Sequence, residues 1–316
     1  MADAVNMSPW RGRVDPEPET ARWHQRVQPL TVDATPGIVL HGFASDAGVI
    51  RNKGRPGAAA GPDAIRSMLA NSAWHGTRAV HDAGNVVCGD DSEGQALEAA
   101  QAELGTRITA ALDAGHQVIS LGGGHAIAFA SWQGIAGSLA GIESVPRIGI
   151  INLDAHFDLR DPDHVRSSGT PFSQIAADCS RRGWPFAYAC LGVARTSNTV
   201  NLYKRARELG VLIHEDRDFE RVPDAVYANL SAFIAACDHL YLTIDLDGFP
   251  ASEAPGVSAP AARGVSITRL EPLIDLIRDS GKLLLADIAE MNPDYDIDNR
   301  TARLAARLVH QIVCQS

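Results

Sequence analysis

The sequence predicts a three-layer α/β/α fold, and two regularities support this prediction. Short apolar runs alternate with longer segments of helical periodicity along most of the 316 residues, which is typical of parallel strands joined by right-handed helical crossovers. Several apolar runs, such as 147–153 and 282–288, are almost continuous, as expected for strands that are buried on both faces. We therefore expect one large domain around a parallel sheet.

Each element of this fold is assigned from its own segment of the chain. The expected strands are 37–41, 85–88, 117–121, 147–153, 187–192, 211–213, 239–244 and 282–288. The expected helices are 62–70, 95–114, 126–139, 172–181, 201–209, 224–236, 269–278 and 299–313. Residues 1–35 are polar and aromatic with several prolines, so we expect an N-terminal arm on the surface of a single domain, 36–316.

Composition narrows the class of protein and its partners. Hydrophobic residues make up 45% and charged residues 21% of the chain, which is ordinary for a globular protein. A formal net charge of -10 disfavours nucleic acid and anionic membranes as partners. The five cysteines are odd in number and form no CxxC pair, and the N-terminus resembles no secretory signal. We therefore expect a cytoplasmic protein with free thiols.

Potential metal ligands follow three of the expected strands. In parallel α/β folds the chemistry lies beyond the carboxyl ends of the strands. Residues two apart at the end of an extended segment point in the same direction, so the side chains of each group are expected to converge. The candidates are His125 after three glycines, then Asp154, His156 and Asp158, and finally Asp245 and Asp247.

Four carboxylates cannot share one cleft in ionised form unless cations compensate them. Two divalent ions bring the sum to neutrality, and oxygen and imidazole donors without thiolate favour Mn²⁺ over Zn²⁺. Each motif alone has a simpler interpretation, either a turn before a helix or a solvated surface turn. Their occurrence at three strand ends predicts a site with two metals.

These motifs resemble the metal motifs of the arginase (ureohydrolase) family, which includes arginases, agmatinases and formimidoylglutamases. The matching segments are 123–125, 154–158 and 243–247, and 61–66 and 287–293 resemble two further family signatures. The resemblance implies an eight-stranded parallel sheet in a single arginase-like catalytic domain, two Mn²⁺ ions, and hydrolysis of an amidine or a guanidine.

The resemblance also implies a role for individual residues. One ion would be bound by His125, Asp154, Asp158 and Asp245, and the second by His156, Asp154, Asp245 and Asp247, with Asp154 and Asp245 bridging. Glu290 matches the family glutamate that holds the cationic head of the substrate, which is consistent with the strong contact between a carboxylate and a planar cation. Asp158 is the expected proton carrier.

Further segments resemble the formimidoylglutamases within this family. Arg160 stands where arginases carry an asparagine, and 167–172, 48–55 and 191–199 match as well. Ser168 occupies the place of a histidine in arginases and agmatinases, which argues against those two activities. A substrate with two carboxylates needs cations, and Arg160, Arg195 and the cluster of Arg51, Lys53 and Arg55 can supply them.

The resulting hypothesis is hydrolysis of N-formimidoyl-L-glutamate, a small anionic amidine, to L-glutamate and formamide in histidine degradation. A hydroxide bridging two Mn²⁺ ions would attack the formimidoyl carbon in a homo-oligomeric enzyme. Three alternatives stay open. The first is a guanidino-acid hydrolase of the same family, such as a guanidinobutyrase, which would release urea. The second is a single-zinc deacetylase of the same fold, and the third is a protein that binds or assembles without catalysis.

Overall fold

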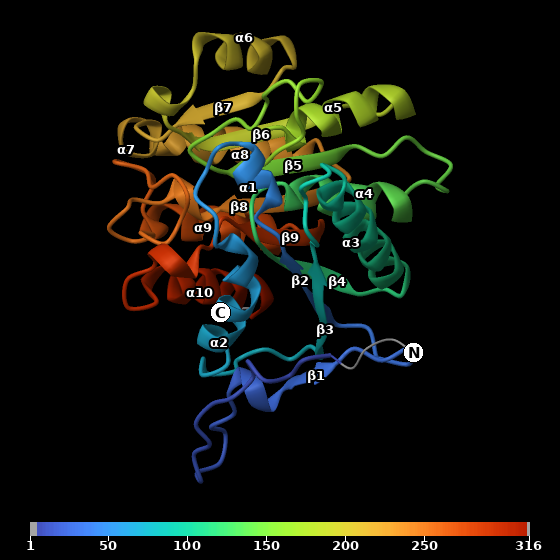
Figure 1. Ribbon diagram of the computed structural model, residues 1–316, viewed down its shortest axis with the longest axis vertical. Coiled ribbons are helices and arrows are strands. Elements are labelled where there is room, and N and C mark those ends of the chain that lie inside the picture. The colour runs from blue at the N-terminus through green and yellow to red at the C-terminus, as the bar shows by residue number, and fades with distance from the viewer. Residues whose placement is uncertain (1–4, 315–316) are drawn as a thin grey trace.

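A nine-stranded parallel sheet lies between two layers of helices in the computed structural model, which describes residues 5–314 (Figure 1). The strands are β1 (Val27–Pro29), β2 (Ile38–Ala44), β3 (Val80–Val87), β4 (Gln117–Gly122), β5 (Ile148–Leu153), β6 (Ala187–Val193), β7 (Leu212–Glu215), β8 (His239–Asp245) and β9 (Leu283–Ala289). Their order in the sheet is β1-β3-β2-β4-β9-β8-β5-β6-β7. Four of them, β4, β9, β8 and β5, are neighbours near the middle, and their carboxyl ends lie at one edge of the sheet.

Helices cover both faces of this sheet. They are α1 (Ala47–Arg51), α2 (Gly61–Leu69), α3 (Ala96–Asp113), α4 (Ile127–Ser138), α5 (Pro171–Arg182), α6 (Val200–Glu208), α7 (Asp218–Arg221), α8 (Pro223–Ala235), α9 (Ile267–Asp279) and α10 (Arg300–Val313). Buried side chains of α2, α8, α9 and α10 pack on one face, and those of α3, α4, α5 and α6 pack on the other. The three-layer α/β/α prediction is confirmed.

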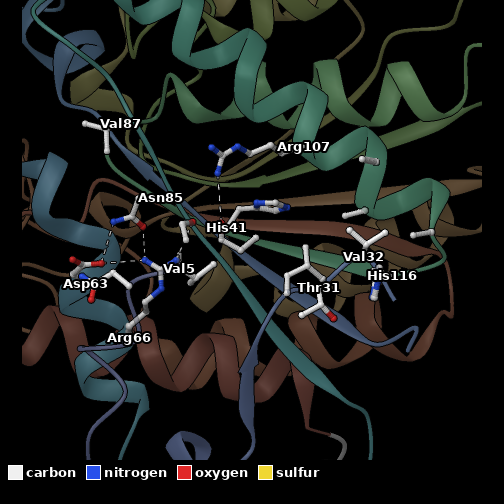
Figure 2. A pocket seen from close by; sticks show the side chains of 17 residues that line it. Val5, Thr31, Val32, His41, Asp63, Arg66, Asn85, Val87, Arg107 and His116 are labelled. Carbon is white, nitrogen blue, oxygen red and sulfur yellow. Dashed lines mark hydrogen bonds and ion pairs between the residues drawn. The ribbon is translucent and has the colours of Figure 1, made fainter. Parts of the chain in front are cut away.

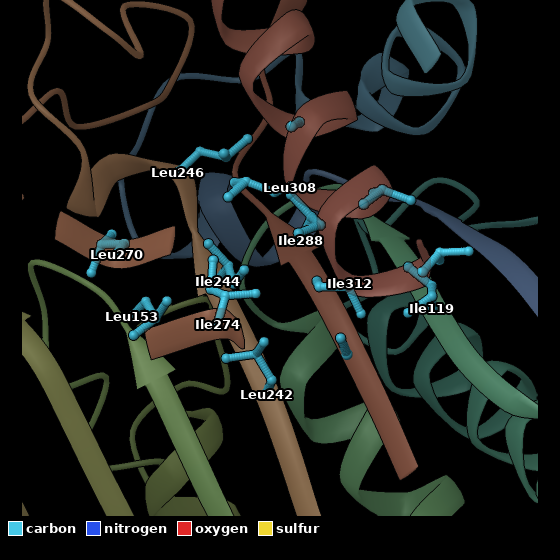
Figure 3. Close-up of a cluster of buried hydrophobic side chains, with 14 of the residues drawn as sticks. Ile119, Leu153, Leu242, Ile244, Leu246, Leu270, Ile274, Ile288, Leu308 and Ile312 are labelled. Atoms are coloured by element: carbon cyan, nitrogen blue, oxygen red, sulfur yellow. The ribbon is translucent and has the colours of Figure 1, made fainter. Parts of the chain in front are cut away.

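The apolar core is divided by the sheet because successive strand residues point to opposite faces. In β8, Leu242 and Ile244 point toward α9 and α10 (Figure 3), whereas Tyr241, the residue before Leu242, points toward the other helix layer. All three side chains are fully buried. Burial of one such aliphatic side chain contributes about 1.5–3 kcal/mol, so the near-continuous apolar runs are what holds the middle strands in place.

The expected number of eight strands is wrong, because β1 adds a ninth. Val27 lies opposite Val80 and Pro29 opposite Asp82 in the pairing of β1 with β3. A three-residue strand with a glutamine and a proline has no alternating pattern, which is why the sequence did not reveal it. Trp23, four residues earlier, is completely buried. The division into an arm, 1–35, and a catalytic domain, 36–316, stays a prediction.

The five cysteines are all free thiols, as expected from the composition. Between residues 5 and 314, no helix has both the length and the apolar character needed to cross a bilayer.

Candidate metal centre

The predicted ligands converge at the carboxyl ends of β4, β5 and β8. His125 lies in the turn between β4 and α4, the second group follows β5, and Asp245 is the last residue of β8. The side chains form two groups that can each surround an ion, and Asp154 belongs to both. The groups are His125, Asp154, Asp158 and Asp245, and Asp154, His156 and Asp247.

The first group surrounds one ring nitrogen of a buried histidine. Nδ1 of His125 lies 3.2 Å from Oδ2 of Asp154, 2.9 Å from Oδ2 of Asp158 and 3.0 Å from Oδ2 of Asp245. These four side chains are at most 12% exposed. Three carboxylate oxygens thus meet one imidazole nitrogen in a site with little access to water.

The second group is more open and shares a carboxylate with the first. Nδ1 of His156 lies 3.1 Å from Oδ2 of Asp247 and 3.5 Å from Oδ1 of Asp154. The side chain of His156 is 25% exposed. Because the two oxygens of Asp154 face different histidines, this carboxylate can bridge two ions.

The donor set fits divalent cations better than it fits hydrogen bonding. Nε2 of His125 lies 2.9 Å from the hydroxyl of Thr243, a buried partner that suits the protonated ring nitrogen. Nδ1 then carries a lone pair, and it has no hydrogen-bond partner among residues 5–314. A lone pair among three carboxylate oxygens is repulsive unless a proton or a metal ion lies between them. Ligand atoms about 2.1 Å from a metal lie about 3 Å from one another, which matches the spacing here.

The pKa values among these side chains show the same need for positive charge. Burial and the neighbouring carboxylate of Asp245 raise the pKa of Glu290 to about 8. Burial, together with the carboxylates of Asp154 and Glu290, raises the pKa of Asp247 to about 6 against the lowering effect of His156. Bound divalent ions reverse this effect, because they stabilise the ionised form of every carboxylate around them.

The backbone is shaped closely around the ligands. A Cβ atom on Gly123 would lie 1.8 Å from the carbonyl oxygen of Ser45, so only glycine fits at this position. Asp158 and Glu290 both adopt the left-handed region, with φ of 47° and 68°. Such a conformation costs about 1–2 kcal/mol for a residue with a side chain. It turns both side chains into the cleft, Glu290 directly after β9 and Asp158 five residues after the end of β5.

Hydrogen bonds to the turn before α4 hold Glu290 next to the predicted metal ligands. Its Oε1 accepts a hydrogen bond of 2.8 Å from the backbone N–H of His125, and its own N–H donates to the carbonyl of Gly123. The side chain is 5% exposed. The turn before α4 and the end of β9 are therefore locked together, and the carboxylate is held at the base of the cleft.

Two buried residues that orient the ligands were not predicted. Asn152 donates a hydrogen bond of 2.9 Å to Oδ2 of Asp154 and one of 3.0 Å to the hydroxyl of Tyr188. Thr243 fixes the ring of His125 as described above. Both stand two residues before a ligand in a strand, Asn152 before Asp154 and Thr243 before Asp245, so the two-residue period of a strand was the signal that could have found them.

One cleft of about 320 Å³ opens above the ligands. Glu290, Arg160 and Ser168 line it, together with Lys53 from the loop after α1. The backbone N–H of Arg160 donates to the carbonyl of Gly169, which fixes the segment that follows Asp158. Within the described chain, neither Arg160 nor Lys53 forms an ion pair, so both charges are available to a ligand.

The other predicted cations lie away from this cleft or are engaged elsewhere. The side chain of Arg195 pairs with Glu215 at 3.2 Å, is 71% exposed, and does not line the cleft. Arg51 forms ion pairs with Asp91 and Glu98. Arg55 lines the cleft, but its guanidinium donates to the backbone carbonyls of residues 257 and 258.

Comparison with known proteins agrees with this architecture. The model of the arginase family matches residues 36–314, which is most of the chain. The chain belongs to the arginase family. Its sequence is 56% identical over 315 residues to a formimidoylglutamase of Aeromonas hydrophila, with 98% of both chains covered. It is 54% identical over 312 residues to a formimidoylglutamase of Ralstonia nicotianae, covering 96% of this chain and 94% of the relative.

Solved structures of the family share the fold. The formiminoglutamase of Trypanosoma cruzi, solved with Mn2+2, superimposes with a TM-score of 0.76 at 26% identity, covering 88% of this chain and 92% of that one. The formimidoylglutamase of Bacillus subtilis gives a TM-score of 0.82 over 95% of this chain and 93% of its own, and its 19% identity supports the fold alone.

Proposed function

We propose that this arginase-family protein hydrolyses N-formimidoyl-L-glutamate to L-glutamate and formamide, as a step of histidine degradation. One observation carries the proposal. A single cleft combines the two groups of metal ligands at its base with the buried carboxylate of Glu290 and the guanidinium of Arg160, which forms no ion pair within residues 5–314. It thus offers an anion for a cationic amidinium and a cation for a carboxylate, and the proposed substrate has both groups. The identity to formimidoylglutamases over nearly the whole chain supports the same conclusion.

The two groups of ligands suit two Mn²⁺ ions. His125, Asp154, Asp158 and Asp245 would hold one, and His156, Asp154, Asp245 and Asp247 the other, with Asp154 and Asp245 shared. Carboxylates and imidazoles without a thiolate form a hard-to-borderline donor set, which favours manganese over zinc. Two such ions supply a water of lowered pKa at neutral pH and stabilise negative charge on the substrate.

Glu290 and Asp158 act on the amidine itself. Glu290 faces the cleft, and its Oε2, the oxygen that does not bind the N–H of His125, is free to accept a hydrogen bond from the amidinium. Water adds to the formimidoyl carbon, and the bond from that carbon to the glutamate nitrogen breaks. Asp158 accepts the proton of the attacking water and delivers it to the departing nitrogen, which leaves as the amine of L-glutamate while the carbon leaves as formamide.

Arg160 orients the substrate from the wall of the cleft. A guanidinium binds a carboxylate in a bidentate manner, which fixes the distance between that carboxylate and the reacting carbon. Ser168 lines the same wall and offers a hydroxyl to the substrate. Arg195 lies outside the cleft, so it is not among the proposed contacts.

Product identification tests the proposed reaction. Purified protein loaded with Mn²⁺ is incubated separately with formimidoylglutamate, 4-guanidinobutyrate, arginine and agmatine, and formamide, urea and L-glutamate are measured. We expect formamide and L-glutamate in equal amounts from the first compound alone. Urea from a guanidino acid would replace the proposal with the guanidino-acid hydrolase.

Metal counting on the same sample tests the centre. We expect two ions per chain in the wild type and a reduced number in Asp247→Asn, which keeps the size of the side chain but removes its charge. One tightly held zinc ion per chain would instead indicate the deacetylase alternative, and turnover of no compound in the panel would favour a protein that binds without catalysis.

The cellular setting stays a proposal with simpler tests. The free state of all five cysteines is consistent with the reducing cytoplasm, which fractionation of cells with an antibody against the protein can examine. A homo-oligomer is expected, and light scattering coupled to size-exclusion chromatography measures it.

A further inference from the structure

A second and larger cavity lies away from the metal centre, with a volume of about 1090 Å³ (Figure 2). Side chains from β2, β3, α3 and the segment that follows β1 line it, and none of the six predicted metal ligands is among them. The proposed hydrolysis makes no use of this space. Its polar lining residues must therefore be explained separately.

His41 is the most unusual residue of this lining. It lies in β2, and its side chain is 1% exposed. Neither ring nitrogen has a hydrogen-bond partner within residues 5–314. Burial and the charges of Arg107 and Arg66 lower the pKa of His41 to about 3, so the ring is neutral at pH 7 and offers one N–H and one lone pair. A buried polar group without a partner is destabilising, and native proteins seldom leave two of them on one ring.

Arg107 supplies a positive charge to the cavity. It lies on α3, and its guanidinium pairs with Glu103 at 2.6 Å, with side chains 39% and 52% exposed. An exposed ion pair of this kind contributes little to stability, so a ligand can replace it. A hydrogen bond of 3.5 Å to the carbonyl of Ala83 points the guanidinium toward the part of the sheet that carries His41, as Figure 2 shows.

The positive charge of Arg66, the second arginine of the cavity, is already compensated by neighbouring carboxylates. Its guanidinium binds both oxygens of the buried Asp82, at 2.8 and 3.0 Å, and also contacts Asp63 and Asn85. Asp63 is the one carboxylate among the lining residues that the structure describes, and Arg66 and Asn85 already engage it. Among these residues, the available charge is therefore that of Arg107.

The remaining lining offers a further donor and an apolar wall. Nδ1 of His116 accepts a hydrogen bond from the backbone N–H of Gly37, so in the neutral ring the proton is on Nε2 and that atom is a donor. The small side chains of Ala110 and Ala111 in α3 and of Ala114 directly after it form an apolar part of the lining. A ligand for this space must bring acceptor atoms, a negative charge and a short apolar body.

We propose that this cavity binds a small aliphatic carboxylate, with its oxygens on the guanidinium of Arg107 and on a ring N–H of His41. The methylene groups of the ligand pack against the alanines of α3. The partner that His41 lacks is then supplied by the ligand, and the exposed contact of Arg107 with Glu103 gives way to a less solvated one. This proposal does not depend on the reaction at the metal centre.

Titration calorimetry with butyrate and with glutarate tests the proposal. The full-length Arg160→Ala protein is the background, because it removes the proposed carboxylate contact of the catalytic cleft. We expect heat of binding for at least one of the two compounds below about 10 mM, the range in which the free energy of binding exceeds about 2.7 kcal/mol. Adding Arg107→Gln should weaken binding about 10-fold to 150-fold, the effect of losing a hydrogen bond between charged groups. Absence of binding in the background protein would overturn the proposal.

A matched control and a spectroscopic readout locate the ligand. Lys204→Gln removes the cation of another exposed helical pair, with Glu208 at 3.8 Å, and should leave binding unchanged. In protein labelled with ¹⁵N-histidine, the carboxylate should shift the ring signals that His41→Gln removes. Binding that Arg107→Gln does not weaken, or that leaves the His41 signals in place, would refute the assignment.

Discussion

Replacing Thr243 by valine removes one hydroxyl beneath the metal centre with almost no change in shape. The hydroxyl lies 2.9 Å from Nε2 of His125, and the two residues are 0% and 1% exposed. A metal on Nδ1 requires the proton to stay on Nε2, so the metal-bound state of Thr243→Val contains a buried N–H without an acceptor. The metal-free ring does not have this unsatisfied N–H, because its proton can move to Nδ1, where the carboxylates accept a hydrogen bond.

The penalty therefore falls on metal binding. An unsatisfied buried donor costs about 1–3 kcal/mol, which corresponds to about 5-fold to 150-fold weaker binding of the ion on His125. Loss of a residue that orients a metal ligand typically weakens binding by about 10-fold to 100-fold. Competition between the protein and a chelator of known Mn²⁺ affinity measures the change, and metal analysis after dialysis gives the number of ions retained.

Two variants separate this effect from a general loss of stability. Thr243→Ser keeps the hydroxyl and should keep wild-type affinity. Thr301→Val alters another fully buried threonine, whose hydroxyl accepts a hydrogen bond from Gly256. It should lower the melting temperature and leave metal affinity unchanged. If Thr243→Val holds two ions as tightly as the wild type does, the proposed orientation of His125 is wrong.

Three further predictions concern the substrate, the pH dependence and the core. Arg160→Ala should raise KM for formimidoylglutamate about 10-fold to 150-fold with unchanged metal content. Arg195→Ala should leave KM unchanged. If steady-state kinetics gave the same change in KM for both variants, the placement of Arg160 inside the cleft and of Arg195 outside it would be contradicted. With a chelator present, the melting temperature should fall as pH rises from about 5 to 8. The reason is that the raised pKa values of Glu290 and Asp247 make the folded state bind more protons than the unfolded one. With excess Mn²⁺ the melting temperature should instead rise with pH, because the ion binds deprotonated ligands. Leu242→Ala should lower the free energy of unfolding by about 2–5 kcal/mol, and a change below about 1 kcal/mol in urea denaturation would show that its cavity collapses.

The central strands were predictable because their sequence is under a strong local constraint. β5 and β8 are buried on both faces and carry apolar residues at most of their central positions, and the candidate ligands begin directly after β5 and at the last residue of β8. The two-residue period and the rule that chemistry lies at carboxyl ends then bring the ligands together. Long helices such as α3 were found within a residue or two of their ends for a similar reason, since their periodicity extends over several turns.

Features that depend on distant partners were not predictable. The arginine of the 191–199 segment appeared suitable for a substrate carboxylate, but its direction is set by Glu215 and by the ring of Tyr203, which belong to other elements. β1 is a strand only because β3 offers it an edge. His41 falls within an expected strand, yet no local pattern reveals that both nitrogens of its ring lack partners.

The position of the ligands along the chain has a consequence during protein synthesis. The ligands come from residues 125 to 247, and Glu290 follows still later. A growing chain cannot complete either group before Asp245 and Asp247 have been synthesised, when nearly four-fifths of the protein has been made. Ions bound by the proposed ligands would link segments about 120 residues apart, and closing so long a loop constrains the unfolded chain most strongly. Manganese supply during growth should therefore influence how much newly made chain escapes proteolysis, besides its activity.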